Sequence, residues 1–310
     1  MAETSTTRAG AAGLDESGKP AEVVRLGSAQ GNWFRRVGWR HLVGVLALAF
    51  SLFPILFVLS SALNPLGTLA SSQLIPTGAT LANFRKILFD TNFPIWFLNT
   101  LIIGLVSAFL SMFVSACAAF AFSRFRFKGR RSGLLGVLLV QMFPALLAIV
   151  ALYLMFAKIS DYWPLIGFNT RWGLLLLYMG GALGTTTWLM KGFFDTIPKD
   201  LDESAKVDGA SHAQIFFGII LPLVAPILAV TGLLGFIGAV NEFMIASIFL
   251  TEDSAKTAAV GLFGLVSEER NSNFGVFAAG SLILALPIVA LFQYLQRYIV
   301  GGLTAGAVKG

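Results

Sequence analysis

Charged residues are scarce in this chain. They make up 12% of the 310 residues, whereas 56% are hydrophobic and the mean hydropathy is +0.79. Soluble domains carry about a quarter of their residues charged, so this composition excludes an ordinary soluble domain and indicates a polytopic membrane protein. The meaning of the net charge of +6 depends on where the basic residues lie along the chain. It gives no reason to expect a nucleic-acid partner.

Residues that carry chemistry are equally rare. Cys117 is the only cysteine, which excludes an internal disulfide, and His41 and His212 stand far apart. The sequence contains no G-x4-G-K-[ST] phosphate loop, no H-E-x-x-H motif and no Cys/His cluster. No credible catalytic triad is present either. We therefore expect no catalytic residue, no metal site and no cofactor in this chain, and an intramembrane enzyme is poorly supported.

Long apolar runs dominate what is present. A bilayer-spanning helix needs about 20 residues, and six runs are long enough. They are His41–Leu63, Ile95–Phe122, Gly133–Ala157, Trp172–Met190, Leu223–Leu250 and Phe274–Gln296. We predict an all-α polytopic membrane protein with six transmembrane helices and both termini on one side.

The segments outside the spans complete the predicted organisation. Residues 1–40 form a largely disordered tail, since they are rich in Ala, Gly, Ser and Thr. An external segment at 64–94 separates the first span, 41–63, from a core at 95–297. That core contains a cytoplasmic loop at 191–222 and an external loop at 251–273, and a C-terminal tail follows at 298–310.

Lysine and arginine placement predicts the orientation. The set of segments that includes both termini holds 16 of the 22 basic residues, and the opposite set holds six. Because cytoplasmic segments are enriched in Lys and Arg, both termini, the SRFRFKGRR loop and the loop after Lys191 are predicted to be cytoplasmic.

The polar stretch from Lys191 to Pro226 is more ordered than a connector requires. Pro198 suits a first helical turn, acidic residues follow it, and helical periodicity continues on both sides of Gly209. Gly209 can supply the turn between two short helices. The pattern favours a rigid element that docks on another protein. The alternative is an amphipathic helix on the membrane surface.

The segment from Glu203 to Pro226 resembles the EAA loop of bacterial ATP-binding-cassette (ABC) importer permeases, which have the type I ABC importer permease fold. It departs from the family pattern at Ser204, where Ala is usual. In that family the loop is a coupling helix seated in a cleft of a separate ATPase subunit. The resemblance implies these coupling residues: Glu203, Ser204, Ala205, Asp208, Gly209, Ala210, Phe216, Leu221 and Pro222.

Glu242 is the one ionisable residue well inside a predicted span, next to Asn241. A carboxylate there costs about 2.5–3.5 kcal/mol on insertion scales. Asn241 and Glu242 either border the transport path or hold the fifth helix against its neighbour, or Glu242 lies near the outer interface and is hydrated. The Asn-Glu-Phe triplet resembles the sugar-permease branch of the family.

Small residues recur at helical spacing in two predicted spans. Ser107, Ser111, Ser115 and Ala119 form one such stripe, and glycines recur from Gly232 to Gly238. Such stripes let helices approach closely. They indicate either packing within one subunit or a subunit interface.

Two further segments resemble maltose-type permeases. LIPTGATLANFRKIL, before the second span, is similar to a segment common in sugar-importer permeases, and the external loop matches one that reaches into the sugar-binding protein. The resemblance implies a contact at Gly261, Leu262, Phe263, Gly264 and Leu265. The tail GLTAGAVKG is similar to one that reaches between the ATPase subunits, which implies contacts from Gly302, Leu303, Thr304, Ala305, Gly306 and Lys309. The alternative for the tail is a frayed end.

Together these resemblances imply a permease subunit of a maltose or maltodextrin importer in the bacterial plasma (inner) membrane. They imply four partners: a MalF-like permease, a MalK-like ATPase homodimer that binds ATP and Mg, an external sugar-binding protein, and membrane lipid. Alternatives are a permease for trehalose or another α-glucoside, an ion-gradient-driven secondary transporter, and a channel or scaffold.

Overall fold

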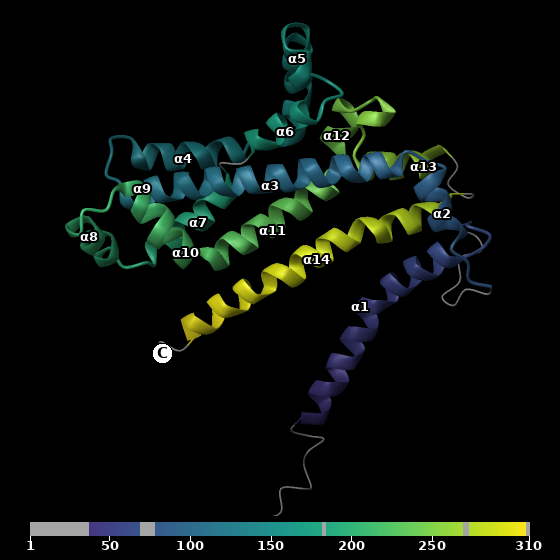
Figure 1. The fold of residues 1–310 in the computed structure, drawn as a ribbon, viewed down its shortest axis with the longest axis horizontal. Helices are drawn as coiled ribbons and strands as arrows, with labels where there is room; N and C mark the ends of the chain where they lie inside the picture. The colour runs from purple at the N-terminus through teal and green to yellow at the C-terminus, as the bar shows by residue number, and fades with distance from the viewer. Residues whose placement is uncertain (1–36, 69–77, 182–183, 269–272, 308–310) are drawn as a thin grey trace, which may run out of the picture. The chain divides into compact units, whose positions relative to one another are not determined.

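The computed structural model describes residues 37–68, 78–181, 184–268 and 273–307, and every regular element within these ranges is helical (Figure 1). The all-α class is thereby confirmed. The predicted disordered tail at 1–40 lies almost wholly outside the described residues, as does Lys309. The chain divides into two compact units, Met1–Pro54 and Ile55–Gly310, with the division inside the first helix, α1 (Trp39–Leu63).

The second unit contains all the other elements. In chain order they are α2 (Ala82–Phe89), α3 (Phe93–Arg124), α4 (Arg130–Gln141), α5 (Ala145–Tyr162), η3 (Pro164–Ile166), α6 (Arg171–Gly180), α7 (Thr185–Asp195), α8 (Asp200–Val207), α9 (His212–Ile215), η4 (Phe216–Ile220), α10 (Leu221–Leu223), α11 (Ala225–Asn241), α12 (Met244–Phe249), η5 (Asp253–Ala255), α13 (Ala258–Glu268) and α14 (Phe274–Ala307).

Three of the predicted spans are single helices long and apolar enough to cross a membrane: α1, α3 and α14. Two bent pairs pass the same test, α6 with α7 at 56° and the α9–α10 segment with α11 at 79°, which brings the number to at most five among the described residues. The predicted run Gly133–Ala157 is instead divided between α4 and α5. Pro144 stands at the break with extended backbone. Proline also disfavours helix in the residue before it, which is Phe143.

Helix α3 is the centre of the second unit. It packs along α11, and α6 and α7 also lie against it (Figure 1). A Cβ on Gly104 would lie 3.0 Å from Phe236, and one on Gly232 would lie 3.2 Å from Met112. The predicted small-residue stripes therefore include close packing within this chain, which is how helices associate where lipid removes the usual hydrophobic driving force.

The last helix is longer than predicted. We expected a span that ends near Gln296 and a flexible tail, but α14 continues to Ala307 and includes Gly302–Gly306. No proline lies beyond Pro287 to end the helix.

Candidate functional site

The loop between α7 and α11 has the predicted pair of short helices joined at Gly209. Helix α8 carries Asp200, Asp202 and Glu203 in its first turn, where they oppose the positive end of the helix dipole. At its other end the Gly209 N–H donates to the Lys206 carbonyl (3.0 Å) and the Ala210 N–H to the Ala205 carbonyl (2.9 Å). With Gly209 at φ +80° this is a Schellman motif, which calls for a residue tolerant of left-handed backbone.

The second short helix starts at once after the turn. Ser211 accepts a hydrogen bond from the Gln214 N–H, and the Gln214 side chain accepts one from the Ser211 N–H, so the two form a capping box. A π-helical turn, η4, and the short α10 continue the chain to Val224, where it bends into α11. The turn at Gly209 is thus held by backbone hydrogen bonds, and the start of α9 is held by side-chain hydrogen bonds.

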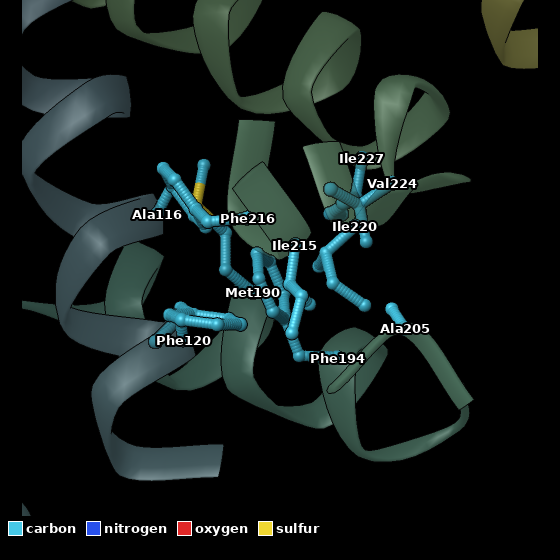
Figure 2. Close-up of a cluster of buried hydrophobic side chains, with 11 residues drawn as sticks. Ala116, Phe120, Met190, Phe194, Ala205, Ile215, Phe216, Ile220, Val224 and Ile227 are labelled. Carbon is cyan, nitrogen blue, oxygen red and sulfur yellow. The ribbon is translucent and has the colours of Figure 1, made fainter. Parts of the chain in front are cut away.

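The inner face of this loop is built into a hydrophobic core. Figure 2 shows Ala205, Ile215 and Phe216 directed toward Phe120 of α3 and Phe194 of α7. The ring centroids of Phe120 and Phe216 lie 4.9 Å apart, within the range of favourable aromatic pairs. The loop is therefore anchored to two spanning segments by packing.

The outer face of the same loop carries a different part of the predicted coupling set. Glu203, Ser204, Asp208, Gly209 and Pro222 are exposed, whereas Ala205 and Phe216 are buried and Ala210 and Leu221 are half-buried. Two apolar side chains, Leu201 (42% exposed) and Val207 (88% exposed), lie among the exposed residues. The nine predicted residues thus divide into an anchoring face and a free face.

A buried ion pair ties this loop to α3, and sequence reasoning missed it. Arg124 Nε lies 2.7 Å from Asp202 Oδ2, with side chains 5% and 7% exposed, and Arg124 Nη2 donates to the Ile197 carbonyl (3.1 Å). From the sequence, Asp202 is only one of the acidic residues that follow Pro198. The one available signal was the spacing of Asp202 and Ala205, three residues apart and so on one helical face.

The preceding residue of α3 makes a second polar link. Ser123 Oγ donates to Asp195 Oδ1 (2.6 Å), and Lys191 Nζ pairs with Asp195 Oδ2 (2.5 Å). Ser123 and Arg124 together therefore hold the end of α7 and the start of α8 against the end of α3.

Glu242 lies at a break in the predicted fifth span. Helix α11 ends at Asn241, Glu242 has extended backbone, and α12 begins at Met244. The carboxylate accepts hydrogen bonds from the N–H groups of Ile245 (2.7 Å) and Ala246 (3.0 Å) and from the Tyr178 hydroxyl (2.7 Å). Since it satisfies amides that the break leaves open, Glu242 holds α12 and α6 to the end of α11.

The same carboxylate also borders a cavity of about 270 Å³. The polar residues that line this cavity are Ser107, Ser111, Tyr178, Thr186 and Glu242. The exposed Asn241 side chain is directed back to the Ile237 carbonyl (2.9 Å) and does not line it. Glu242 therefore both holds helices together and borders a polar cavity. Asn241 does neither with its side chain.

The loop predicted to be external is held in place by hydrogen bonds where it begins. Asn169, at φ +56°, accepts hydrogen bonds from the Thr251 and Glu252 N–H groups (2.7 and 2.9 Å), and Asn99 Nδ2 donates to the carbonyls of Ser254 and Lys256 (3.0 and 2.9 Å). These bonds fix the loop where it leaves α12.

The predicted contact residues in that loop are not equally available. Gly261 and Leu262 are buried, and a Cβ on Gly261 would overlap Trp96. Gly264 and Leu265 are half-buried, and Phe263 is exposed. In this structure only Phe263 offers a large surface to a partner, because the pitch of α13 turns its neighbours inward.

A protein with several apolar spans and a rigid, partly exposed loop between two of them fits the membrane component of a transporter. The family model for "Binding-protein-dependent transport system inner membrane component" matches residues 111–304. The permease protein GanQ of the galactooligosaccharides transport system of Bacillus subtilis (strain 168) is 40% identical over 87% of this chain and 96% of its own length. MalG of the maltose/maltodextrin transport system of Yersinia pestis is 39% identical over 87% of this chain and 92% of its own length.

A solved structure agrees in fold. A chain in the crystal structure of a bacterial ABC transporter involved in the import of the acidic polysaccharide alginate superposes with a TM-score of 0.69, at 22% identity, over 87% of this chain and 98% of that chain. The chain belongs to the family of binding-protein-dependent transport system inner membrane components. It is a multi-pass permease subunit of an ABC importer, and the ATPase is a separate subunit.

Proposed function

We propose that this chain is one of two permease subunits that form the path for a maltodextrin-type oligosaccharide, with both termini in the cytoplasm. The second permease is a different chain of the same class. A cytoplasmic ATPase homodimer binds ATP and Mg²⁺, and an external binding protein delivers the sugar. The names of relatives support the sugar class, since they include maltose/maltodextrin and galactooligosaccharide permeases.

The observation that carries this proposal is the two-faced loop at Gly209. The exposed residues Glu203, Ser204 and Asp208 are available to an ATPase cleft, while Ala205 and Phe216 pack on the spanning helices. A movement of the ATPase would thus reach α3, α7 and α11 as a rigid-body displacement.

In the alternating-access mechanism that we propose, ATP binding closes the ATPase dimer and displaces the loop. Helices α3, α7 and α11 move with it, since the core of Figure 2 joins them to α8 and η4. Gly302–Gly306 and Lys309 are proposed to reach the ATPase subunits, and Phe263 is proposed to contact the binding protein. An ion-gradient-driven transporter gains no support from a family that depends on a binding protein.

The test is reconstitution of the purified assembly in vesicles, with the binding protein outside and ATP inside. We expect sugar-stimulated ATP hydrolysis and uptake of labelled maltodextrin, both reduced at least tenfold by Glu203→Ala with the assembly intact. Stimulation by galactooligosaccharide or trehalose in place of maltodextrin would overturn the sugar assignment alone. Uptake without ATP would overturn the coupling mechanism.

A further inference from the structure

A hollow outside the transport machinery lies just beyond the end of α3. It measures about 520 Å³, and its lining residues include Phe127, Gly129, Arg130, Arg131, Ser132 and Lys191. Helix α3 passes the length and apolarity test for a membrane span and ends at Arg124. Residues 127–132 follow a few positions later, so the hollow lies just beyond the end of a helix that is able to span a membrane.

The hollow has an excess of positive charge. Lys191 is paired with Asp195 (2.5 Å), and Arg130 lies within electrostatic reach of that same carboxylate. Among the described residues neither Arg130 nor Arg131 makes a salt bridge or a side-chain hydrogen bond. The lining thus carries three cations, and the Asp195 carboxylate pairs with one of them and lies within electrostatic reach of a second. Both guanidinium groups have donors to spare for a phosphate.

An apolar strip leads away from the charged hollow along α4. Arg131, Leu135 and Leu138 are spaced four and three residues apart and share one face of the helix. Leu135 is 49% exposed and Leu138 is 37% exposed, and Phe127, at the rim of the hollow, is 46% exposed. A phosphate placed between the guanidinium groups would have apolar surface running from it toward the membrane interior.

The wall of the hollow is rigid. Trp188 Nε1 of α7 donates to the Leu134 carbonyl of α4 (3.2 Å), and Thr185 Oγ1 donates to Gln141 Oε1 (2.6 Å). These bonds join α4 to α7 at two levels, so the helices that carry Arg131 and Lys191 are linked to one another without a ligand. A preformed site loses less entropy on binding.

We propose that this hollow binds the phosphate headgroup of an anionic phospholipid, with an acyl chain lying along Leu135 and Leu138. The charge alone would suit any phosphate. The apolar strip and the position beyond a spanning helix favour the lipid over a free ion. The site is separate from the coupling face of α8, and lipid binding does not depend on the proposed sugar or on ATP.

The test uses the detergent-solubilised assembly that contains this chain and native mass spectrometry. Short-chain phosphatidylglycerol, short-chain phosphatidylcholine and glycerol phosphate are each titrated into the assembly, and their affinities are compared. Glycerol phosphate has the headgroup without acyl chains. We expect phosphatidylglycerol to bind at least tenfold more tightly than either. Arg130→Gln/Arg131→Gln should weaken it about 25-fold, since each basic side chain contributes roughly fivefold toward an anionic lipid.

The matched control is Arg126→Gln/Lys128→Gln, which removes the same charge from the same loop outside the lining, and which should leave binding within twofold. Equal affinity for glycerol phosphate would show a simple phosphate site and overturn the lipid assignment. Unchanged phosphatidylglycerol binding in the Arg130/Arg131 variant would overturn the site. Loss of the ATPase from that variant with unchanged lipid binding would show a protein contact instead. Thermal unfolding of both double variants checks that each is folded.

Discussion

Arg124 and Asp202 form a buried ion pair between the last residue of α3 and the first turn of α8, with Nε and Oδ2 separated by 2.7 Å. Arg124 Nη1 and Asp202 Oδ1 are buried without a hydrogen-bond partner among the described residues. The pair therefore depends on mutual charge compensation more than on a complete hydrogen-bond network. It links α3 directly to α8.

Replacing one member of this ion pair should destabilise the protein more than replacing both members. Asp202→Leu leaves the Arg124 charge buried and should cost about 3–5 kcal/mol, whereas Arg124→Met/Asp202→Leu should recover most of that loss. Thermal unfolding of the assembly in detergent measures both. A double variant as unstable as the single one would show that Arg124 acts mainly through the Ile197 carbonyl.

The backbone of Gly209 should matter more than the space around it. A Cβ at this position would meet nothing within 4 Å, but φ is +80°. Gly209→Val should cost about 1–2 kcal/mol of local strain and reduce sugar-stimulated ATP hydrolysis with the protein still inserted. Gly209→Asn should retain most of the sugar-stimulated ATP hydrolysis, because Asn tolerates left-handed backbone. Normal ATP hydrolysis in Gly209→Val would disprove the need for left-handed backbone at this position. Loss of hydrolysis in Gly209→Asn would indicate instead that the partner surface leaves no room for a side chain here.

Glu242 should be a stability residue as well as a cavity residue. Tyr178→Phe removes one hydrogen bond to the carboxylate, worth about 1.5–3 kcal/mol for a bond to a charged group. It should lower the unfolding temperature. Glu242→Ala should lower it further, because two amides of α12 lose their acceptor. If instead Tyr178→Phe changes the apparent affinity for sugar in uptake assays with unfolding unchanged, the cavity role is the main one.

Acidification should loosen the start of the external loop. Burial acts to raise the pKa of the Asp253 carboxyl, but hydrogen bonds from Asn92 and Lys256 outweigh it and hold the pKa below its ordinary value. A depressed pKa contributes stability above the unfolded value, about 3.9, and that contribution is lost as pH falls through the folded value.

Hydrogen exchange of the backbone amides of Ser254–Thr257 between neutral pH and about pH 3 measures this effect, after correction for intrinsic rates. Protection should fall in the wild type and stay flat in Asp253→Asn. Parallel behaviour of the two proteins would exclude Asp253 as the titrating group.

Two substitutions in α13 should have different effects, because Phe263 is exposed and Gly261 is buried. Phe263→Ala should weaken stimulation by the sugar-loaded binding protein with little effect on unfolding. Gly261→Ala should destabilise the fold by about 1–3 kcal/mol, because its new methyl group would overlap Trp96. If the binding protein stimulates ATP hydrolysis equally in Phe263→Ala and in the wild type, Phe263 does not form the proposed contact.

The sequence by itself determined the membrane class, the helical architecture and the short-helix pair around Gly209. These features depend on local composition and on spacing along the chain, such as apolar runs of sufficient length and a glycine at a left-handed turn. The resemblance to the EAA loop placed Glu203, Asp208 and Phe216 in one functional segment. It did not show that Glu203 and Asp208 are exposed whereas Phe216 is buried.

Only the tertiary structure decided which of those residues are free and what holds the segment in place. Arg124 and Asp202 are 78 positions apart, and Tyr178 and Glu242 are 64 apart, and no periodicity in the sequence relates members of such pairs. The breaks at Pro144 and Glu242 likewise interrupt apolar runs that look continuous in composition. A buried charge is stable only beside its partner, and the fold alone brings the two together.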